Sequence, residues 1–580
     1  MNNTPVLPTF YYQHNFLHLL QRVNNLYRDL LNDAEIQFVD DFLALSQDAQ
    51  CLYIRLLCRK GDVFRLDKLN YPEIHSPDLA CQELLNAQFF CSVDLTDISD
   101  FGENNLIKLF TKKELLDRYC GIAPEAQRGA LNALSREQLE QRLLTQAESE
   151  SWWQSLLSVG VIGVFGELEF TTLRLLYFGN LHQDFSDFVL RDLGIYRYEK
   201  YPLELNSRGF NQRCQIDQYL EYDQLLTAMP ELKQQTAEQL LHWAECFQQL
   251  AATCDDALLQ RRIARRCCEL ARQLERLAED DAAMALYRQL PVHPARERCC
   301  RILFQRKEIA ALVTECQSIA ARPYHVVEYQ FLQQFLPRVI RWLKQQQRFS
   351  LMAQCQALLQ PAAALHQRTL TLARDDVWRQ QGVEAAAISA LQAEGDGHAY
   401  HLENALILSV FGLYFWPLLY APVSGAFFHE FQAAPLDLYE PDFICRRQSV
   451  YDQLLQQLQD FTGSQQLELC VLGTAEEKHG INNPFVFWGL LQPENLALVG
   501  QAIRQIPLAH WQAMFAYLWA DLKHHRNGLP DLLWLSDDGG YRLIEVKGPG
   551  DTLQQNQRGW LEYFSRQGIP ASVLYIRAAD

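Results

Sequence analysis

The sequence predicts a multidomain, mainly α-helical protein that ends in an α/β core. Its 580 residues are enough for about three or four domains of ordinary size. Residues 231–385 carry apolar side chains at helical spacing almost throughout, whereas residues 510–580 alternate between helical and extended patterns. With 48% hydrophobic and 21% charged residues, the composition is that of a globular protein and argues against a disordered, collagenous or fibrous chain.

The charge and the cysteines narrow the class of protein further. A net charge of −18 argues against a purely electrostatic coat for nucleic acid, but local basic strips on an acidic body can still bind phosphate. The 16 cysteines include no C-x-x-C pair, so the sequence predicts a reduced, intracellular protein. The first residues, MNNTPVLPTFYYQHNF, lack the basic and apolar regions of a secretory signal.

One uncharged segment is long enough to cross a bilayer. Residues 405–428 contain no charged side chain over 24 positions, and about 20 apolar residues span a membrane. Pro417, Pro422 and a Ser-Gly step interrupt the second half of this segment, which shortens its continuous helical pattern. We therefore predict a buried core helix and no membrane contact.

The N-terminal region, residues 1–230, is predicted to contain small helical and mixed units. Residues 10–90 show a helix, a turn, a short strand and a helix, which is compatible with a winged-helix module and equally with any small α+β domain. Residues 107–145 contain two short helices, the second opening with a capping box of Ser135 and Gln138. With their basic residues, these helices resemble a SAP-type DNA-binding element; the alternative is a helical hairpin with a solvated face.

Residues 231–385 are predicted as an atypical, tetratricopeptide-like α-solenoid. LAEDDAAMAL and LFQRKEIAAL match at an offset of 26 residues, which is short for a tetratricopeptide repeat. Within this region, residues 258–307 hold 12 Lys and Arg against 6 Asp and Glu. Four of the arginines fall at helical spacing and are candidate phosphate contacts, although such runs are usually solvated helix faces: Arg261, Arg262, Arg265 and Arg266.

The C-terminal residues predict an α/β core built around a hairpin. DLLWLS (531–536) and YRLIEVKG (541–548) have strand patterns, and Asp537–Gly540 forms the turn between them. A helical pattern follows at 551–568, and ASVLYIR (571–577) is a final strand. Together with the preceding helices, this core is assigned to residues 386–580.

Two carboxylates and a lysine fall together on this hairpin. Glu545 and Lys547 point to one face of their strand, whereas Val546 points to the other. Asp531 opens the partner strand, so the hairpin brings it beside Glu545. Adjacent carboxylates repel unless a cation or proton joins them, and Mg²⁺ or Mn²⁺ takes such oxygen ligands. A metal ion and a nearby ammonium are the parts that phosphodiester cleavage needs.

The ordinary alternative is a solvent-facing Glu-Lys pair on an edge strand and a turn aspartate. The rest of LIEVKG is apolar, so its charges fall in a predicted core strand, where unpaired charge is costly. The basic stretch Lys523–Arg526 lies just upstream of Pro530. That position suits a phosphate contact and makes Arg526 a further candidate DNA-binding residue.

At these residues the chain resembles a known family. KHHRNGLPDLLWL and YRLIEVKGPGDTLQQNQRGWLEYF resemble the VRR-NUC domain of the PD-(D/E)XK nuclease superfamily. Residues 401–448, together with FGNLHQDFSDFVLRDLGIYRYEKY and LYRQLPVHPARERCCRIL, resemble the Fanconi-associated nuclease family in the order of its units. The resemblance covers nearly the whole chain and implies an N-terminal DNA-binding region, a helical repeat domain and a C-terminal nuclease domain.

The resemblance implies a structure-selective DNA nuclease that cuts 5′ flaps, degrades DNA from 5′ to 3′ (phosphodiesterase I type) and acts in interstrand crosslink repair. It assigns metal binding to Asp531, Glu545, the backbone carbonyl of Val546 and an upstream Glu403, and catalysis to Asp531, Glu545 and Lys547. The expected cofactor is Mg²⁺ or Mn²⁺, and the expected partner is branched or flap DNA. A bacterial-type member is expected in the cytoplasm, and a eukaryotic one in the nucleus.

Two alternatives remain open from the residues. One is a junction resolvase or another PD-(D/E)XK nuclease, and the other is a catalytically inactive helical scaffold. Glu403 has its own alternative, because a carboxylate in the first turn of the following helix is favoured by the helix dipole without any metal.

Overall fold

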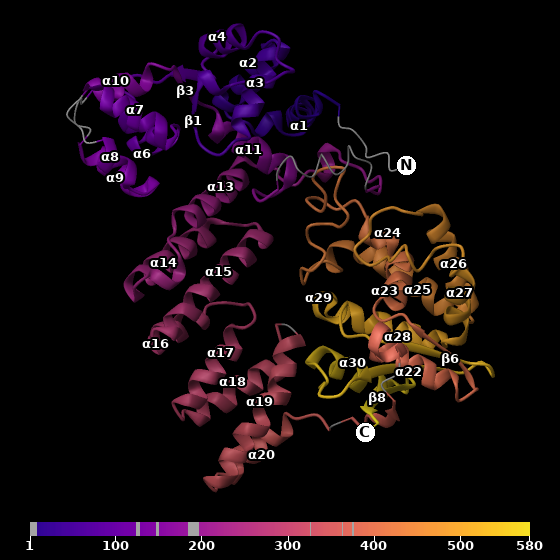
Figure 1. The fold of residues 1–580 in the computed structure, drawn as a ribbon. Helices are drawn as coiled ribbons and strands as arrows, with labels where there is room; N and C mark the ends of the chain where they lie inside the picture. Colours follow the sequence, from indigo (N-terminus) through magenta and orange to yellow (C-terminus); the bar gives the residue numbers. More distant parts are fainter. Residues whose placement is uncertain are drawn as a thin grey trace. The chain divides into compact units, whose positions relative to one another are not determined.

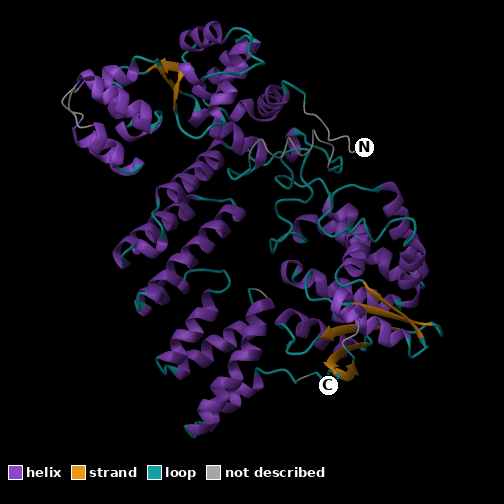
Figure 2. Cartoon of the chain, viewed as in Figure 1, coloured by secondary structure: helices purple, strands orange, loops and turns teal. Residues whose placement is uncertain are grey.

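A computed structural model of the chain describes residues 8–122, 128–146, 150–183, 196–324, 326–361, 363–373 and 376–579. Its contacts divide the chain into two units. The N-terminal unit consists of Met1–Ile195 with Leu203–Ile216, and the C-terminal unit of Tyr196–Pro202 with Asp217–Asp580. Both units are mostly helical, and the described strands form one sheet in each (Figure 2).

The N-terminal unit packs helices around a small antiparallel sheet. Helix α2 begins at a capping box, in which Asn32 and Glu35 bond to each other's backbone N–H. The sheet order is β1-β3-β2, and its middle strand comes from residues far beyond the 10–90 unit predicted from sequence, so the winged helix stays a prediction. The elements are α1 (Tyr11–Tyr27), α2 (Asp33–Ala44), α3 (Gln47–Leu57), β1 (Val63–Arg65), α4 (Pro77–Asn86), β2 (Phe90–Ser92), β3 (Val161–Val164) and α11 (Glu167–Phe178).

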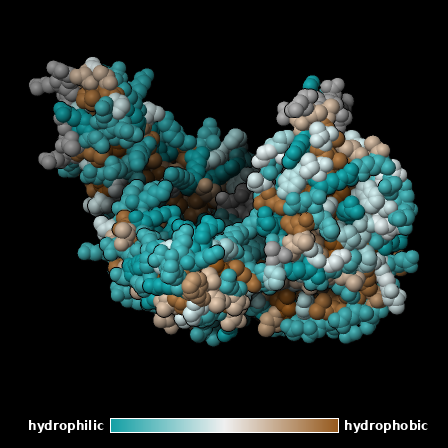
Figure 3. Space-filling view, turned by 90° about the horizontal axis from the view of Figure 1, so that it is seen from below, coloured by the Kyte–Doolittle hydropathy of each residue, from teal (hydrophilic) through white to brown (hydrophobic). Residues whose placement is uncertain are grey.

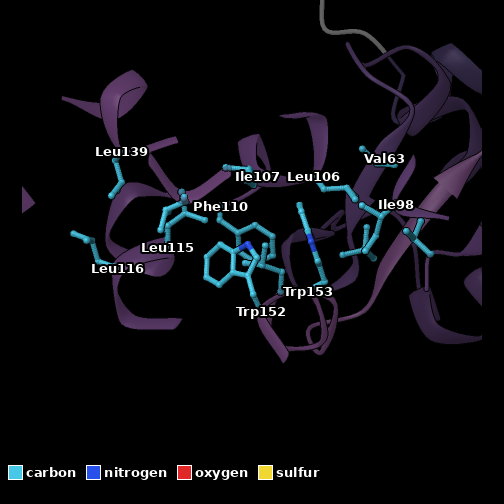
Figure 4. Close-up of a cluster of buried hydrophobic side chains, with 14 residues drawn as sticks. Val63, Ile98, Leu106, Ile107, Phe110, Leu115, Leu116, Leu139, Trp152 and Trp153 are labelled. Carbon is cyan, nitrogen blue, oxygen red and sulfur yellow. The ribbon is translucent and has the colours of Figure 1, made fainter. Parts of the chain in front are cut away.

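The predicted SAP-like segment is helical, and it shares a hydrophobic core with β1 and β3 of the sheet. Leu115, Leu116 and Trp152 lie in this core with Ile107 and Phe110 (Figure 4). The capping box of the second helix is confirmed, because Ser135 and Gln138 exchange hydrogen bonds of 2.9 and 3.2 Å. The helices are α5 (Ile98–Phe101), α6 (Glu103–Lys108), α7 (Lys112–Ile122), α8 (Arg128–Ala133), α9 (Arg136–Gln146) and α10 (Glu150–Leu157).

Two basic side chains of the SAP-like segment are used within the fold. Lys112 Nζ donates to the carbonyl oxygens of Asn132 and Leu134, each at 2.7 Å, and Arg136 pairs with Glu140. These contacts explain how the short helices are held together. DNA binding by this segment stays a prediction.

Residues 196–202 belong to the C-terminal unit, although the residues on both sides belong to the N-terminal unit. Glu199 accepts a hydrogen bond from Trp416 Nε1 at 2.7 Å and pairs with Lys478 at 3.0 Å. Tyr201 donates to the carbonyl oxygen of His429 at 2.6 Å. The next segment returns to the N-terminal unit, where Arg208 forms a two-pronged ion pair with Asp29.

Helices follow one another through the region predicted as a repeat, and each contacts the next from α14 to α20 (Figure 1). Three of their connections share a tight turn at a non-glycine residue with positive φ: Ala278, Lys307 and Gln347. In each turn, the residue after it donates to a carbonyl five positions earlier, at 2.9 to 3.0 Å. The helices are α13 (Arg213–Ala228), α14 (Ala237–Thr253), α15 (Ala257–Arg276), α16 (Asp280–Tyr287), α17 (Ala295–Gln305), α18 (Ile309–Ala321), α19 (Val326–Gln345) and α20 (Phe349–Ala357).

The shared turns correct the repeat offset. Ala278, Lys307 and Gln347 are 29 and 40 residues apart, so the offset of 26 predicted from sequence is wrong. That offset aligned similar letters on either side of the turns rather than the turns themselves. Assignment to a tetratricopeptide-like solenoid stays a prediction.

The C-terminal sheet is mixed, with the order β4-β8-β7-β6-β5. The hairpin of β6 (Leu532–Ser536) and β7 (Tyr541–Lys547) is confirmed, as is the final strand β8 (Ala571–Ala578), which pairs parallel to β7. Strand β4 (His366–Leu372) lies in the range predicted as almost wholly helical, and that prediction is wrong there. Its partner β8 is distant in sequence, so no local pattern signals the pairing; β5 (Gly397–His401) likewise pairs with β6.

The uncharged segment is a buried core helix, as predicted. Helix α23 (Ala405–Tyr414) and the short α24 (Trp416–Leu419) are almost wholly buried. In the described ranges, we find no helix with both the length and the apolarity to span a bilayer. The face drawn in Figure 3 is covered mostly by hydrophilic residues. The other helices are α21 (Asp376–Gln381), α22 (Val383–Gln392), α25 (Gln448–Asp460), α26 (Ser464–Glu477), α27 (Leu496–Gln505), α28 (Leu508–Ala520), α29 (Leu522–His525) and α30 (Gln555–Gln567).

A buried ion pair anchors the segment that leads into α25. Arg447 donates to both carboxylate oxygens of Asp437, at 2.8 and 2.9 Å, and each residue is 2% exposed. Arg446 reaches the same carboxylate at 2.6 Å. Removing one member of such a pair leaves an uncompensated buried charge.

We expect Arg447→Met to destabilise the C-terminal unit by about 3 kcal/mol, because Asp437 would stay buried with a single partner. The matched control is Arg368→Met, which breaks the exposed Arg368–Glu394 pair and should cost less than about 1 kcal/mol. Urea unfolding followed by fluorescence measures both. Equal losses in the two variants would contradict a special role for the buried pair.

Candidate active site

Asp531 is delivered to the sheet by a loop that requires glycine. Gly528 has a φ of +86°, and a Cβ on it would lie 2.8 Å from Asn556 Cγ and 2.9 Å from the Asn556 backbone carbon. A side chain would therefore meet both backbone strain and a clash with the first turn of α30. The loop therefore rests on α30 at Asn556 and directs Asp531 into β6.

Glu545 and Lys547 share one face of β7, as predicted. Glu545 is 0% exposed and Lys547 is 8% exposed, and Lys547 Nζ lies 2.8 Å from Glu545 Oε1. Despite this ion pair, neither oxygen of Glu545 accepts a hydrogen bond of good geometry from the described residues. Val546 points the other way, into a core with Leu532 and Ile544.

The structure brings Asp531 to Glu545. Leu532 pairs with Ile544 in the antiparallel register, so Asp531 continues that register to the position opposite Glu545. Asp531 Oδ2 accepts a hydrogen bond from the backbone N–H of Val546 at 2.8 Å. Burial raises the pKa of Asp531, and burial followed by the charge of Asp531 raises the pKa of Glu545 to about 7.

Glu403 lies in the turn between β5 and α23, beside Asp531. The backbone N–H groups of Leu402 and Glu403 both donate to the carbonyl oxygen of Asp531, at 3.1 and 2.9 Å. The Glu403 side chain is exposed, and its charge contributes to the raised pKa of both Asp531 and Glu545. Helix α23 begins only at Ala405, so Glu403 lies before the first turn of the helix. The alternative role, a first-turn carboxylate stabilised by the helix dipole, assumed that Glu403 lies inside that turn.

Sequence reasoning missed Glu384. This residue lies in the first turn of α22 and is half-buried, and its charge helps to raise the pKa of Asp531. The only available signal was an acidic residue after Gly382 at the start of a small-residue helix. Glu384 adds a fourth carboxylate to the electrostatic environment of the site.

The candidate DNA-binding arginines mostly have acidic partners. Arg261 pairs with Glu440 at 2.6 Å and with Asp442 at 3.0 Å, and Arg265 pairs with Glu440 at 3.1 Å. The remaining contacts are Arg266 with Glu269, Arg262 over the ring of Tyr219, and Arg526 with the Tyr439 hydroxyl. Phosphate contact by these residues stays a prediction and, for Arg261, Arg265 and Arg266, would require an exchange of partners.

The residues present fit a divalent cation. A fully buried carboxylate whose partner is the ammonium of Lys547, opposite the half-buried carboxylate of Asp531, needs positive charge beyond that one ammonium. The described residues contain no group of three or more His, Cys, Asp and Glu side chains already arranged as a metal site. The candidate ligand set therefore combines the two facing carboxylates with a backbone carbonyl and Glu403, rather than a preformed cage of side chains.

Comparisons with known proteins agree with this geometry. A family model described as "FAN1, HTH domain" matches residues 10–91, and one described as "VRR-NUC domain" matches residues 463–578. The second range contains Asp531, Glu545 and Lys547. The Fanconi-associated nuclease 1 homolog of Pseudomonas aeruginosa is 33% identical over 597 residues, which cover 99% of this chain and 97% of that protein. The chain belongs to the Fanconi-associated nuclease 1 family. It is therefore an enzyme of the nuclease class, and the resemblance inferred from sequence is confirmed.

Other relatives and structures extend the similarity. The Fanconi-associated nuclease 1 homolog of Arabidopsis thaliana is 24% identical, over 98% of this chain and 67% of that protein. A crystal structure of paFAN1 bound to DNA with a 2-nt 5′ flap and a gap superposes with a TM-score of 0.77 at 32% identity. It covers 99% of this chain and 100% of that chain. The mostly helical fold with its C-terminal sheet is thus shared with paFAN1.

We expect Glu545→Gln to stabilise the metal-free protein increasingly as the pH rises from 5 to 8. The pKa of Glu545 rises from an ordinary 4.5 to about 7 on folding, so ionisation is less favourable in the folded state. The stability of the wild type is therefore lost as the pH rises through this range, by about 3 kcal/mol in all. Melting in EDTA at several pH values measures the effect. Glu494→Gln, on an exposed loop, is the control, and a pH-independent difference for Glu545→Gln would contradict the assignment.

Proposed function

We propose that this enzyme is a metal-dependent, structure-selective DNA nuclease that cuts 5′ flaps and degrades DNA from 5′ to 3′, in the manner of phosphodiesterase I. Its biological role in this proposal is interstrand crosslink repair, in the compartment that holds the chromosome. The observation that carries the proposal is the grouping of Asp531, Glu545 and Lys547 in a chain similar along 99% of its length to paFAN1 bound to 5′-flap DNA.

We assign a separate function to each of three consecutive regions of the chain. Residues 1–230 bind DNA through a winged-helix-like part and the SAP-like element, residues 231–385 form the helical repeat, and residues 386–580 form the nuclease domain. Strand β4, at residues 366–372, joins the nuclease sheet from inside the range proposed for the repeat.

The residues of the site have distinct proposed roles. Asp531 and Glu545 would hold Mg²⁺ or Mn²⁺ together with the Val546 carbonyl, and Glu403 would provide a further carboxylate, the acidic edge of the site. A divalent ion bound there supplies a Lewis acid for the phosphate oxygen and lowers the pKa of an attacking water. Lys547 places an ammonium at the rim of the buried carboxylates, where it offsets negative charge that develops on a phosphodiester. The hydrogen bond from Val546 N–H holds the Asp531 carboxylate in position.

We expect Asp531→Ala, Glu545→Ala and Lys547→Ala each to abolish cleavage of a gapped 5′-flap substrate while DNA affinity stays largely unchanged. The reason is that phosphate contacts are spread over many basic residues, whereas the chemistry depends on one site. The test is cleavage of labelled 5′-flap, 3′-flap and four-way-junction DNA in the presence of Mg²⁺, Mn²⁺ or EDTA. It distinguishes a flap nuclease from a junction resolvase and from an inactive scaffold.

The matched control is Glu494→Ala, which removes an exposed carboxylate outside the site and should cleave like wild type. Near-wild-type turnover by any of the three site variants contradicts the proposal. Preference for the four-way junction by a dimeric wild type identifies a resolvase. A wild type that binds but never cuts identifies an inactive scaffold.

The arginine strip of α15 gives a separate prediction about DNA affinity. Because Glu440 holds both Arg261 and Arg265, we expect Glu440→Gln to tighten binding to duplex DNA, and Arg261→Glu with Arg265→Glu to weaken it. The log–log salt slope should change by about 0.9 for every phosphate that the arginines newly bind or release. Titrations at several salt concentrations measure the slope.

The control for this prediction is Glu394→Gln, which frees Arg368 away from α15. An unchanged salt slope in Glu440→Gln and in the double arginine variant would show that the arginine strip is an ion-paired helix face with no part in DNA binding.

A further inference from the structure

The turn between β5 and α23 is tied to the backbone of Asp531 in an uncommon way. Glu403 has a φ of +37°, a conformation that non-glycine residues rarely adopt and that tertiary contacts must hold in place. The holding contacts are the two hydrogen bonds from Leu402 and Glu403 to the carbonyl oxygen of Asp531. These backbone hydrogen bonds therefore fix the position of the Glu403 backbone, but they do not fix the direction of its exposed side chain.

The side chain of Asn404 supplies the missing restraint. Its Nδ2 donates to Glu403 Oε1 at 3.0 Å, and its Oδ1 accepts from the backbone N–H of Leu529 at 3.3 Å. If the Asn404 amide were reversed, its oxygen would face the Glu403 carboxylate and its NH₂ group would face the N–H of Leu529. Both arrangements are repulsive, so the two contacts together define one orientation of the amide. One amide thus joins the Glu403 carboxylate to the loop that delivers Asp531.

Asn404 does not perform the ordinary task of a residue at its position. It is the N-cap of α23, yet its side chain bonds to no backbone N–H of that helix. Asn32, the N-cap of α2, does accept such a bond from Glu35, as asparagine at this position usually does. The Asn404 amide is directed to the candidate active site at the expense of the helix it precedes.

We propose that Asn404 is a positioning residue, which holds the Glu403 carboxylate in register with Asp531 for cation binding. An amide suits this task because it orients a carboxylate without neutralising it, whereas a lysine or arginine would compete with the cation for the same charge. The proposal deepens the proposed function and rests on it, because it takes Glu403 as the acidic edge of the metal site.

The test is a double-mutant cycle of Asn404→Ser, Glu403→Gln and the two together. Serine is also a favoured N-cap, so Asn404→Ser keeps the start of α23 while it removes both contacts to the site. The readouts are the Mn²⁺ concentration that half-saturates flap cleavage and, without DNA, the increase in melting temperature that Mn²⁺ produces. Asn527→Ala, an exposed residue of the same loop, is the control.

We expect Asn404→Ser to melt like wild type in EDTA, to bind DNA as well, and to need at least threefold more Mn²⁺ in both readouts. In a Glu403→Gln background the same substitution should change nothing further, because residues that act through one another are not additive. Asn404→Ala repeats the measurement if the serine variant melts lower.

Fold-changes that multiply in the double variant, or an unchanged Mn²⁺ requirement, would overturn the positioning role and leave the nuclease assignment intact. Failure of the proposed function looks different: wild type then cuts no flap substrate with any metal. In that case the Mn²⁺-induced melting shifts still decide whether Asn404 acts through Glu403.

Discussion

The burial of Glu545 opposite Asp531 is the constraint on which the rest of this active region depends. Two carboxylates in a low-dielectric sheet repel each other and are costly to ionise, and Lys547 supplies an ammonium that pairs with Glu545. Folding tolerates this arrangement because a rigid hairpin, paired on both sides within a five-stranded sheet, leaves the carboxylates no way to separate. The repulsion between the two carboxylates lowers the stability of the folded state. A bound cation would relieve that repulsion, and this is the physical origin of an affinity for cations.

The surrounding elements can be understood as restraints on that pair. The loop at Gly528 rests on α30 without a side chain between them, the N–H of Val546 holds one carboxylate, and the β5–α23 turn is bonded to the Asp531 carbonyl. These restraints come from four separate stretches of sequence. The geometry of the site therefore depends on contacts among all four stretches.

The sequence sufficed for features with local signals. The hairpin turn Asp537–Gly540, the alternation that sets Glu545 and Lys547 on one face, and the capping box at Ser135 all follow from neighbouring residues, and the structure confirms each. Features with distant partners could not be foreseen: β4 needs β8, and Arg261 meets Glu440 across 179 positions of sequence. Glu384 carried no distinctive spacing. Family resemblance located Glu403, whereas its left-handed backbone and its hydrogen bond from Asn404 depend on the tertiary structure and carry no signal in the sequence.

The path of residues 196–216 has a consequence for how the two units can be separated. The backbone passes from one unit to the other three times, because Tyr196–Pro202 lies in the C-terminal unit and Leu203–Ile216 returns to the first. A single cut between Pro202 and Leu203 divides the polypeptide but leaves each product holding a segment that packs into the other unit. Denaturing electrophoresis would then report two fragments, while the native particle would keep its mass. A nicked enzyme of this design remains one molecule in solution.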